Sequence, residues 1–268
     1  MIRDFLSGVA FLGRGLGFWL TRPALMLVGA IPALIVALVY GAGLVVLAVN
    51  SPGIAEWATP FADGWDEPWR STVRVSAALA LVAAGVLLVV FTFTAITLAV
   101  GDPFYEKIWR ATEEGLGDAP PEPQGGFWRL LWRGLGAGLR ILALTVVIGL
   151  GLFVVGLVPL VGPVLSPVLA AFFGGWVLAL ELTGFAFDAR GGSLRDRRRM
   201  LGARRARTLG FGAAAYLVFL IPLGAVVAMP AAVVGATLLA RAAHAEAGGA
   251  RAGNAEAGRL PVGDAPLI

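Results

Sequence analysis

The sequence predicts an all-α integral membrane protein with two long transmembrane helices, two proline-bracketed, partly penetrating helical hairpins, and interfacial amphipathic helices. Composition is the first reason, because 58% of the residues are hydrophobic and 14% are charged, whereas a soluble domain carries roughly 25% charged residues. Two apolar runs, 24–49 and 75–100, are the second reason, since a bilayer is crossed by about 20 apolar residues in a helix. The third is a proline pattern that occurs twice in the apolar second half.

The first 22 residues predict an interfacial amphipathic helix. Arginines alternate there with apolar side chains at helical spacing, which are Phe5, Val9, Leu12, Leu16 and Trp19. Gly13 and Gly17 either allow close helix packing or reflect the general abundance of glycine in this chain. The apolar run that starts at Ala24 is longer than a cleavable signal core, so we interpret it as a retained membrane anchor.

Interface signals follow the first span. Three tryptophans in the loop 50–74 predict anchoring at a membrane surface: Trp57, Trp65 and Trp69. After the second span, Asp102 and Pro103 predict the start of a new helix, because aspartate caps and proline fits the first turn. Its polar face comprises Glu106, Lys107, Arg110, Glu113 and Glu114. A turn-rich break at 117–126 precedes a basic amphipathic helix at 127–140.

Each proline pattern predicts a helical hairpin. Pro159 and Pro167 stand eight residues apart, as do Pro222 and Pro230, and proline breaks helices because it lacks an N–H. The arms of the second hairpin, 209–221 and 231–241, are too short to cross a hydrocarbon core about 30 Å thick. That hairpin is therefore predicted to be re-entrant. The arms of the first, 141–158 and 168–187, leave full spanning open.

The pattern of charges predicts the orientation. The segment 188–208 carries eight arginines in a short loop, so it is expected in the cytoplasm. Two spans and two returning hairpins then place both termini in the cytoplasm and loop 50–74 outside. We expect a single membrane domain over residues 1–244, followed by a disordered cytoplasmic tail over residues 245–268, which is rich in alanine and glycine.

The arginine-rich segment admits several interpretations. It could bind anionic lipid headgroups, an anionic substrate or nucleic acid, or it could simply hold this loop on the cytoplasmic side. No aromatic stacking platform accompanies the run, so nucleic acid is not expected as a partner. The residues concerned are Arg195, Arg197, Arg198, Arg199, Arg204, Arg205 and Arg207.

Three further ionisable residues are candidates for substrate binding. Glu181 interrupts an apolar stretch and could relay protons, bind a cation, pair with an arginine such as Arg140, or lie near the interface and reach water. Arg22 and Arg140 stand at the ends of apolar segments. Each could extend to the headgroups or hold an anion beside a helix N-terminus. Ala24 and Leu25, which follow Arg22, belong to the same candidate binding region.

Catalytic and metal-binding chemistry is not expected. The chain has no cysteine, and its one histidine, His244, lies in a polar segment. No phosphate-binding glycine loop and no Ser/His/Asp set occurs, so neither enzymatic activity nor a cofactor is predicted.

Several sequence blocks resemble the CysZ-type sulfate permeases, which are grouped with the etoposide-induced-protein domain family. They are LTRPALM (20–26), DPFYEKIWRATEE (102–114), VPLVGPVLSPVLAAFFGGWVLALE (158–181), FDARGGSLRDRRRMLGARRARTLGFG (187–212) and IPLGAVVAMPAAVVGATLLA (221–240). The resemblance covers most of residues 5–242. One departure stands out: the permeases place a Gly-aliphatic-Arg motif that contacts sulfate where this chain has Ala24, Leu25 and Met26.

The resemblance implies a homo-oligomeric permease of the bacterial inner membrane that admits sulfate for cysteine synthesis. On this interpretation, a small oxyanion passes with the help of the helix ends from Arg22 to Leu25 and of the two hairpins. The alternative is a non-transporting membrane factor, such as a lipid-interacting or assembly protein, that works through the arginine segment and the amphipathic helices.

Overall fold

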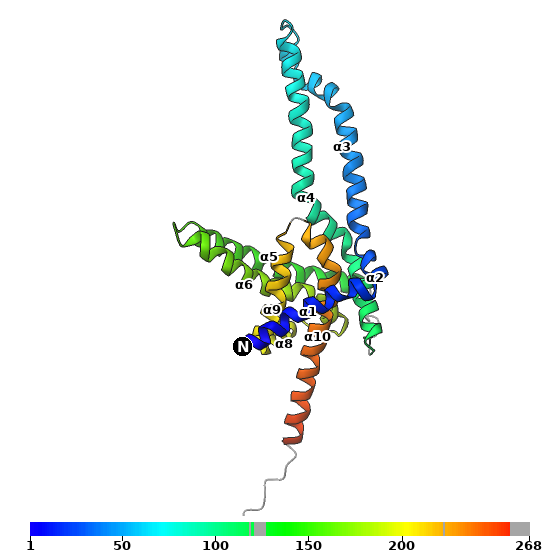
Figure 1. The fold of residues 1–268 in the computed structure, drawn as a ribbon, viewed down its shortest axis with the longest axis vertical. Coiled ribbons are helices and arrows are strands. Elements are labelled where there is room, and N and C mark those ends of the chain that lie inside the picture. The colour runs from blue at the N-terminus through cyan, green and yellow to red at the C-terminus, as the bar shows by residue number, and fades with distance from the viewer. Residues whose placement is uncertain (118, 121–126, 222, 258–268) are drawn as a thin grey trace, which may run out of the picture.

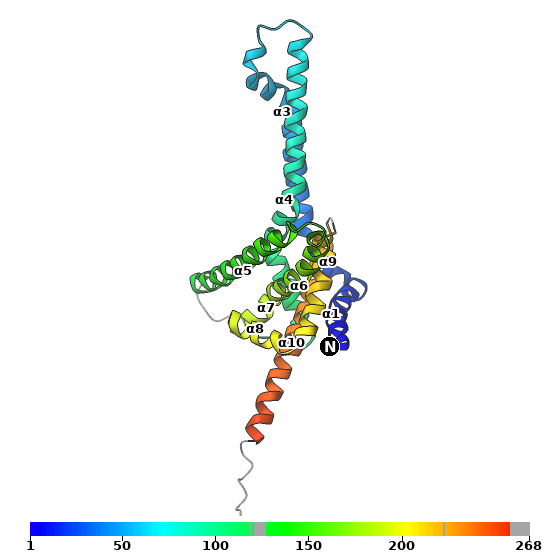
Figure 2. The same ribbon diagram turned by 90° about the vertical axis from the view of Figure 1, so that its left-hand side faces the viewer.

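The computed structural model describes residues 1–117, 119–120, 127–221 and 223–257, and in these ranges every regular element is helical. Two hairpins project from a central body (Figure 1). The pair α3 (Ile31–Ala58) and α4 (Trp69–Gly115) extends to one end of the molecule. The pair α5 (Phe127–Gly156) and α6 (Gly162–Leu182) projects to the side. The chain is thus an all-α protein, and a view turned by 90° shows α10 (Gly224–Ala257) leaving the body opposite the α3–α4 tip (Figure 2).

Helix α1 (Ile2–Thr21) lies against α9 (Arg205–Phe219) and α10 at glycine contacts. A Cβ at Gly8 would overlap the carbonyl oxygen of Arg207, and one at Gly15 would overlap that of Ala231. Gly13 and Gly17 face open space instead. Close packing therefore uses the glycines on the buried face of α1, and the Gly13–Gly17 pair takes no part in it.

The α3–α4 hairpin has the length and surface of a membrane-crossing unit. Its 28-residue helix α3 is about 42 Å long at 1.5 Å per residue. Tyr40 Oη and Thr92 Oγ1 form a hydrogen bond of 2.7 Å between the two helices. At the tip, Arg74 pairs with Glu56 at 3.2 Å and with Asp63 at 2.6 Å, beside the exposed tryptophans of the predicted interface.

Helix α4 continues through Pro103, so the prediction of a new helix at Asp102 was wrong. Two short elements precede α4 in the chain, namely α2 (Pro23–Val28) and the 3-10 helix η1 (Pro60–Ala62). Proline removes one hydrogen bond and bends a helix, and the helix persists where neighbouring segments support it. Figure 1 shows the axis of α4 changing direction below the hairpin.

In each proline pattern the chain reverses beside the leucine that follows the first proline. In the first hairpin the turn lies between α5 and α6, and Leu160 adopts a φ of 66°. In the second it lies between α9 and α10, and Leu223 adopts a φ of 62°. Pro167 and Pro230 lie inside α6 and α10, so the prediction that they break helices was wrong. Pro222 lies outside the described residues.

Five stretches among the described residues are long and apolar enough to cross a membrane. They are Pro23–Ala58, Trp69–Gly115, Gly138–Gly156, Gly162–Leu182 and Gly224–Gly249. In the last stretch, 72% of the most apolar window is buried inside the protein, which makes α10 the core helix. Helix α9, with 15 residues, is about 22 Å long and too short to span.

The two helices between the hairpins are short. Helix α7 (Gly184–Ala189) leads to α8 (Leu194–Ala203), which begins with a reciprocal capping box. Ser193 Oγ accepts from the Asp196 N–H, and Asp196 Oδ2 accepts from the backbone N–H and the hydroxyl of Ser193. These hydrogen bonds from Ser193 hold the pKa of the Asp196 carboxyl below its usual value.

The sequence led us to expect disorder from residue 245 onward, whereas α10 continues through Ala257. Alanine has the highest intrinsic helix propensity, which favours this continuation. Glu246 also ties the segment to the body, because its carboxylate pairs with Arg207 at 2.8 Å and with Arg204 at 3.5 Å. Residues 258–268 lie outside the described residues.

Candidate functional site

A cavity of about 630 Å³ is lined by residues of α4, α5, α6, α7, α8, α9 and α10. Its ionisable lining comes from four helices: Asp102 and Tyr105 of α4, Glu181 of α6, Asp188 of α7 and Arg197 of α8. The apolar part of the lining includes Leu98, Ile141, Leu178, Phe185, Phe219 and Met229. This larger cavity therefore combines apolar walls with three carboxyl groups and one guanidinium.

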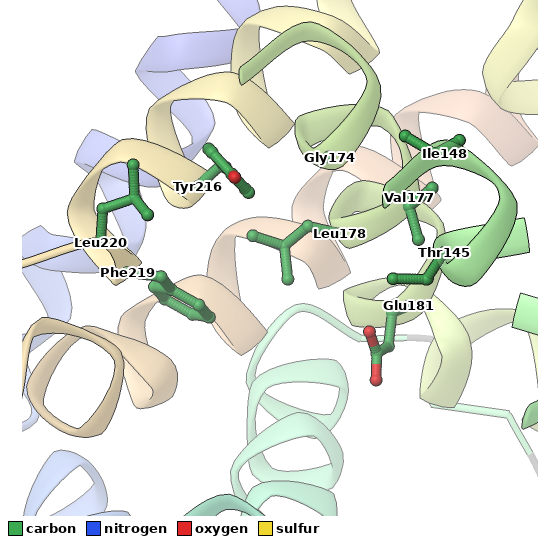
Figure 3. A pocket seen from close by; sticks show the side chains of 9 residues that line it. All are labelled: Thr145, Ile148, Gly174, Val177, Leu178, Glu181, Tyr216, Phe219 and Leu220. Atoms are coloured by element: carbon green, nitrogen blue, oxygen red, sulfur yellow. The ribbon is translucent and has the colours of Figure 1, made fainter. Parts of the chain in front are cut away.

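A smaller cavity of about 300 Å³ adjoins it between α5, α6 and α9 (Figure 3). Its lining is Thr145, Ile148, Gly174, Val177, Leu178, Glu181, Tyr216, Phe219 and Leu220. Glu181 lines both cavities and has an exposed side chain in the single chain. Of the predicted binding residues, Glu181 is the one that the structure places in these cavities.

Arg197 is buried in the wall of the larger cavity, with an exposed fraction of 2%. Its guanidinium donates to the carbonyl oxygen of Leu180 at 2.9 Å and to Asp188 Oδ1 at 2.8 Å. It therefore satisfies a carbonyl at the C-terminal end of α6, where a cation is favoured, and fixes α8 to that end. Headgroup binding, one of the interpretations of the arginine-rich segment, therefore does not apply to Arg197, because its side chain is buried in the protein.

Tyr105 supplies an unusual polar group to the same wall. Its side chain is 1% exposed, and its buried hydroxyl has no hydrogen-bond partner within the described part of the chain. Gly101, one turn earlier on α4, leaves the space that the tyrosine ring occupies. A buried hydroxyl without a protein partner is available to water or to a solute in the cavity.

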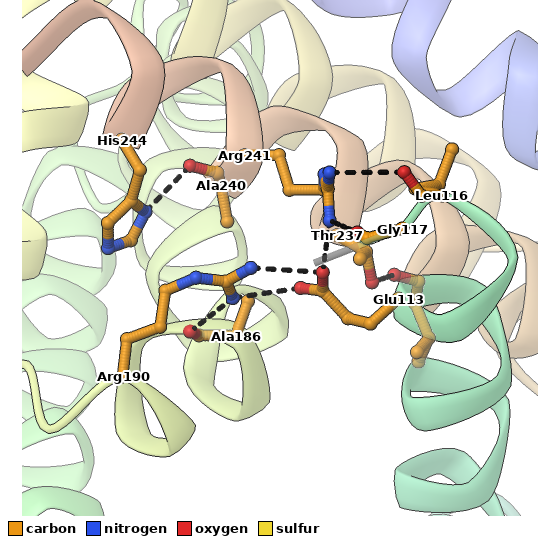
Figure 4. A network of polar contacts seen from close by, with 10 residues as sticks. Glu113, Leu116, Gly117, Ala186, Arg190, Thr237, Ala240, Arg241 and His244 are labelled. Carbon is orange, nitrogen blue, oxygen red and sulfur yellow. Dashed lines mark hydrogen bonds and ion pairs between the residues drawn. The ribbon is translucent and has the colours of Figure 1, made fainter. Parts of the chain in front are cut away.

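A second polar cluster, the Glu113 network, joins the end of α4 to α10 and to the end of α7 (Figure 4). Glu113 is fully buried, and Arg190 donates to both of its carboxylate oxygens at 2.8 and 2.9 Å. Arg241 donates to Glu113 Oε2 at 2.8 Å and to the Gly117 carbonyl at 2.7 Å. Because Arg190 ends α7, which contributes Asp188 to the cavity, this network fixes one cavity wall.

The remaining predicted binding residues lie elsewhere. Arg22 is the N-cap residue of α2. Its guanidinium lies 5.8 Å from the centre of the Phe18 ring and close to Gly115 at the end of α4. Ala24 is exposed, Leu25 is half-buried, and neither lines the two cavities described above. Arg140 is exposed on α5 and is also absent from both linings. The structure thus does not bring these residues to Glu181.

The other members of the arginine segment divide into two groups. Arg204 and Arg207 pair with Glu246. The exposed members, which remain available to headgroups, are Arg195, Arg198, Arg199 and Arg205.

Asp102, Tyr105, Asp188 and the Glu113 network were not among the residues that the sequence predicted for a site. Glu113 was assigned to a polar helix face, and its partners stand 77 and 128 residues away. One signal was available for Asp188, since it directly precedes the arginine-rich segment. No local pattern indicates that Asp102 faces a cavity.

The sequence is similar to that of known proteins. The chain matches the family described as Sulfate transporter CysZ/Etoposide-induced protein 2.4 over residues 11–230. The protein named Sulfate transporter CysZ from Pseudomonas aeruginosa strain LESB58 is 31% identical over 236 residues, which cover 87% of this chain and 94% of that protein. The protein of the same name from Pseudomonas fluorescens strain Pf0-1 is 30% identical, covering 87% and 92%.

A third relative of that name, from Pseudomonas fluorescens strain Pf-5, is 34% identical over 151 residues, covering 55% of this chain and 60% of that protein. The family match begins within α1 and ends within α10, so it includes both hairpins and every element that lines the two cavities. This chain therefore belongs to the Sulfate transporter CysZ/Etoposide-induced protein 2.4 family of multi-pass membrane proteins.

Proposed function

We propose that this protein lets a small oxyanion, sulfate foremost, pass across the bacterial inner membrane for sulfur assimilation. The observation that carries the proposal is the match to proteins named Sulfate transporter CysZ over 87% of the chain. The cavity pair supports it, because charged and polar side chains inside a membrane protein mark the pathways of ions and substrates. The direct test is uptake of radiolabelled sulfate by proteoliposomes that contain the purified protein.

The charges of the larger cavity favour passage linked to protons. Asp102, Glu181 and Asp188 face the same space, and Arg197 already donates to Asp188. A sulfate dianion in this space meets two carboxyl groups that have no cation within the described contacts. Protonation of Asp102 or Glu181 removes one negative charge and supplies an O–H donor for a sulfate oxygen. We therefore expect uptake to increase as the pH falls.

The variant Glu181→Gln tests this role. Glutamine resembles the neutral, protonated glutamate, so uptake at pH 7.5 should approach the rate that the wild type shows at pH 5.5. For the wild type we expect a rise on the order of tenfold over this range, the effect of removing about 1.4 kcal/mol of repulsion. Uptake should be measured at both pH values, with the exposed Glu114→Gln as control. A wild-type pH profile in Glu181→Gln would rule the role out.

Arg22 is the proposed first contact of the anion, together with the neighbouring Ala24 and Leu25. Its guanidinium is exposed at the α1–α2 junction, where it stacks on Phe18. Guanidinium groups bind oxyanions through paired N–H donors. Arg22→Gln is expected to raise the KM for sulfate about tenfold, while Vmax changes less than twofold. Saturation curves check this, and a lower Vmax with unchanged KM would contradict it. Arg14→Gln on α1 is the matched control.

We propose further that both termini face the cytoplasm and that the protein forms homo-oligomers. The exposed arginines of α8 support this orientation, because basic residues collect on the cytoplasmic side. The apolar side chains along α5 and α6 that remain exposed in the single chain support contact with lipid or with another copy.

A further inference from the structure

Three residues line both cavities: Leu178 and Glu181 of α6, and Phe219 at the end of α9. These side chains therefore form a common wall, the partition, of the two cavities. Figure 3 shows the Leu178 side chain projecting between Phe219 and Glu181. Leu178 and Phe219 are half-buried at the edge of the hydrophobic core, so neither side chain is fully enclosed by packing contacts.

The two sides of this partition differ in chemistry. The larger cavity is lined by Asp102, Asp188 and Arg197, so its wall carries charged groups. Among the described residues, the smaller cavity offers Thr145 and Tyr216 as its polar side chains besides the shared Glu181. Its surroundings on α6 and α9 are exposed apolar side chains, including Phe172, Leu217 and Leu220. Where this apolar surface faces lipid, a charged solute cannot cross it, and the route past the partition remains.

We propose that Leu178 and Phe219 form an apolar gate between the two cavities, with Glu181 as the single ionisable group at the constriction. Apolar side chains that narrow a pore exclude water and ions until they separate. The proposal rests on the proposed function for the identity of the solute, but the barrier itself is a property of the cavities. It adds Leu178 and Phe219 as residues that control permeation.

The backbone around the gate is held closely together. A Cβ at Gly212 of α9 would overlap the carbonyl oxygen of Gly175 of α6. The ring of Tyr216 packs against Gly174 in the same crossing. Because α6 and α9 touch backbone to backbone here, the opening depends on the size and rotation of the two side chains, and truncating either one should open the gate.

The absence of cysteine from this chain gives a direct test. Thr145→Cys places a thiol in the smaller cavity, and Ala99→Cys places one in the larger cavity. The anionic thiol reagent sulfonatoethyl methanethiosulfonate is present both inside and outside the proteoliposomes, so that it reaches both membrane faces. The labelling rate of each thiol is followed by intact mass. We expect the thiol in the larger cavity to react at least tenfold faster.

Adding Phe219→Ala to the Thr145→Cys variant should accelerate labelling of the introduced thiol about tenfold. Adding Leu178→Ala to Thr145→Cys should have the same effect. Leu217→Ala is the matched control, because Leu217 lies on α9, is exposed and lines neither cavity. Each variant must elute as a single peak in size exclusion before it is used. Fast labelling of Thr145→Cys with Phe219 intact, or no acceleration in either truncated variant, overturns the gate.

Sulfate uptake by the same vesicles separates the gate from the proposed function. Accelerated labelling without any sulfate uptake supports the gate and removes sulfate as the solute. Sulfate uptake by the wild type, without accelerated labelling in the truncated variants, removes the gate and leaves the transport proposal in place.

Discussion

Glu113→Gln is expected to destabilise the folded protein by about 3 kcal/mol, because removing one partner of a buried ion pair leaves the other charge uncompensated. Glu113 is fully buried, and its carboxylate faces two guanidinium groups, those of Arg190 and Arg241. In the variant these two cations repel each other across a neutral amide. Thermal unfolding in detergent, followed by tryptophan fluorescence, should show the apparent Tm falling by about 5–10 °C.

The neighbouring Glu114→Gln is the control, since Glu114 is exposed and should change the Tm by less than about 2 °C. The double variant Glu113→Gln/Arg190→Gln should lose less stability than the sum of its two single variants, because it removes one of the two unpaired charges. Equal stability of Glu113→Gln and Glu114→Gln would show that the network contributes nothing.

Gly212→Ala is expected to disrupt the crossing of α6 and α9. The added methyl group would overlap the Gly175 carbonyl oxygen, which belongs to backbone and cannot rotate away. Overpacking of this kind typically costs about 1–3 kcal/mol, and a contact with backbone should reach the upper end. The measurement is the apparent Tm together with the yield of monodisperse protein.

Gly13→Ala is the matched control for this substitution. It makes the same chemical change in a helix, but a Cβ at Gly13 meets open space. Alanine favours helix over glycine by up to about 1 kcal/mol, so this variant should be neutral or slightly stabilising. If Gly212→Ala were as stable as Gly13→Ala, the close approach of α6 and α9 would not exist in the protein.

Local sequence signals predicted most of the helical architecture. Apolar length identified the α3–α4 hairpin, and helical spacing identified α1. The Pro-Leu pairs marked both chain reversals, where Leu160 and Leu223 take up the left-handed conformation. Proline alone could not tell a turn from a helix interior, because Pro103, Pro167 and Pro230 are all carried inside helices whose neighbours support them.

The site was less accessible from the sequence, for a physical reason. A cavity is formed by side chains from separate helices, and only the packing decides which face of each helix meets the others. Glu181 was found because an ionisable residue inside an apolar run is conspicuous. Arg197 and Glu113 stand among other charges, so their burial is visible only once α8 and the end of α4 are placed against the core.

Uptake of radiolabelled sulfate by proteoliposomes tests the central claim most directly, with protein-free liposomes as the control. Size exclusion and protease protection should first establish that the protein is folded and inserted. The account predicts saturable uptake above the control, stronger at pH 5.5 than at pH 7.5, and competed by sulfite or selenate. Uptake equal to that of protein-free liposomes, from protein shown to be inserted, would contradict it.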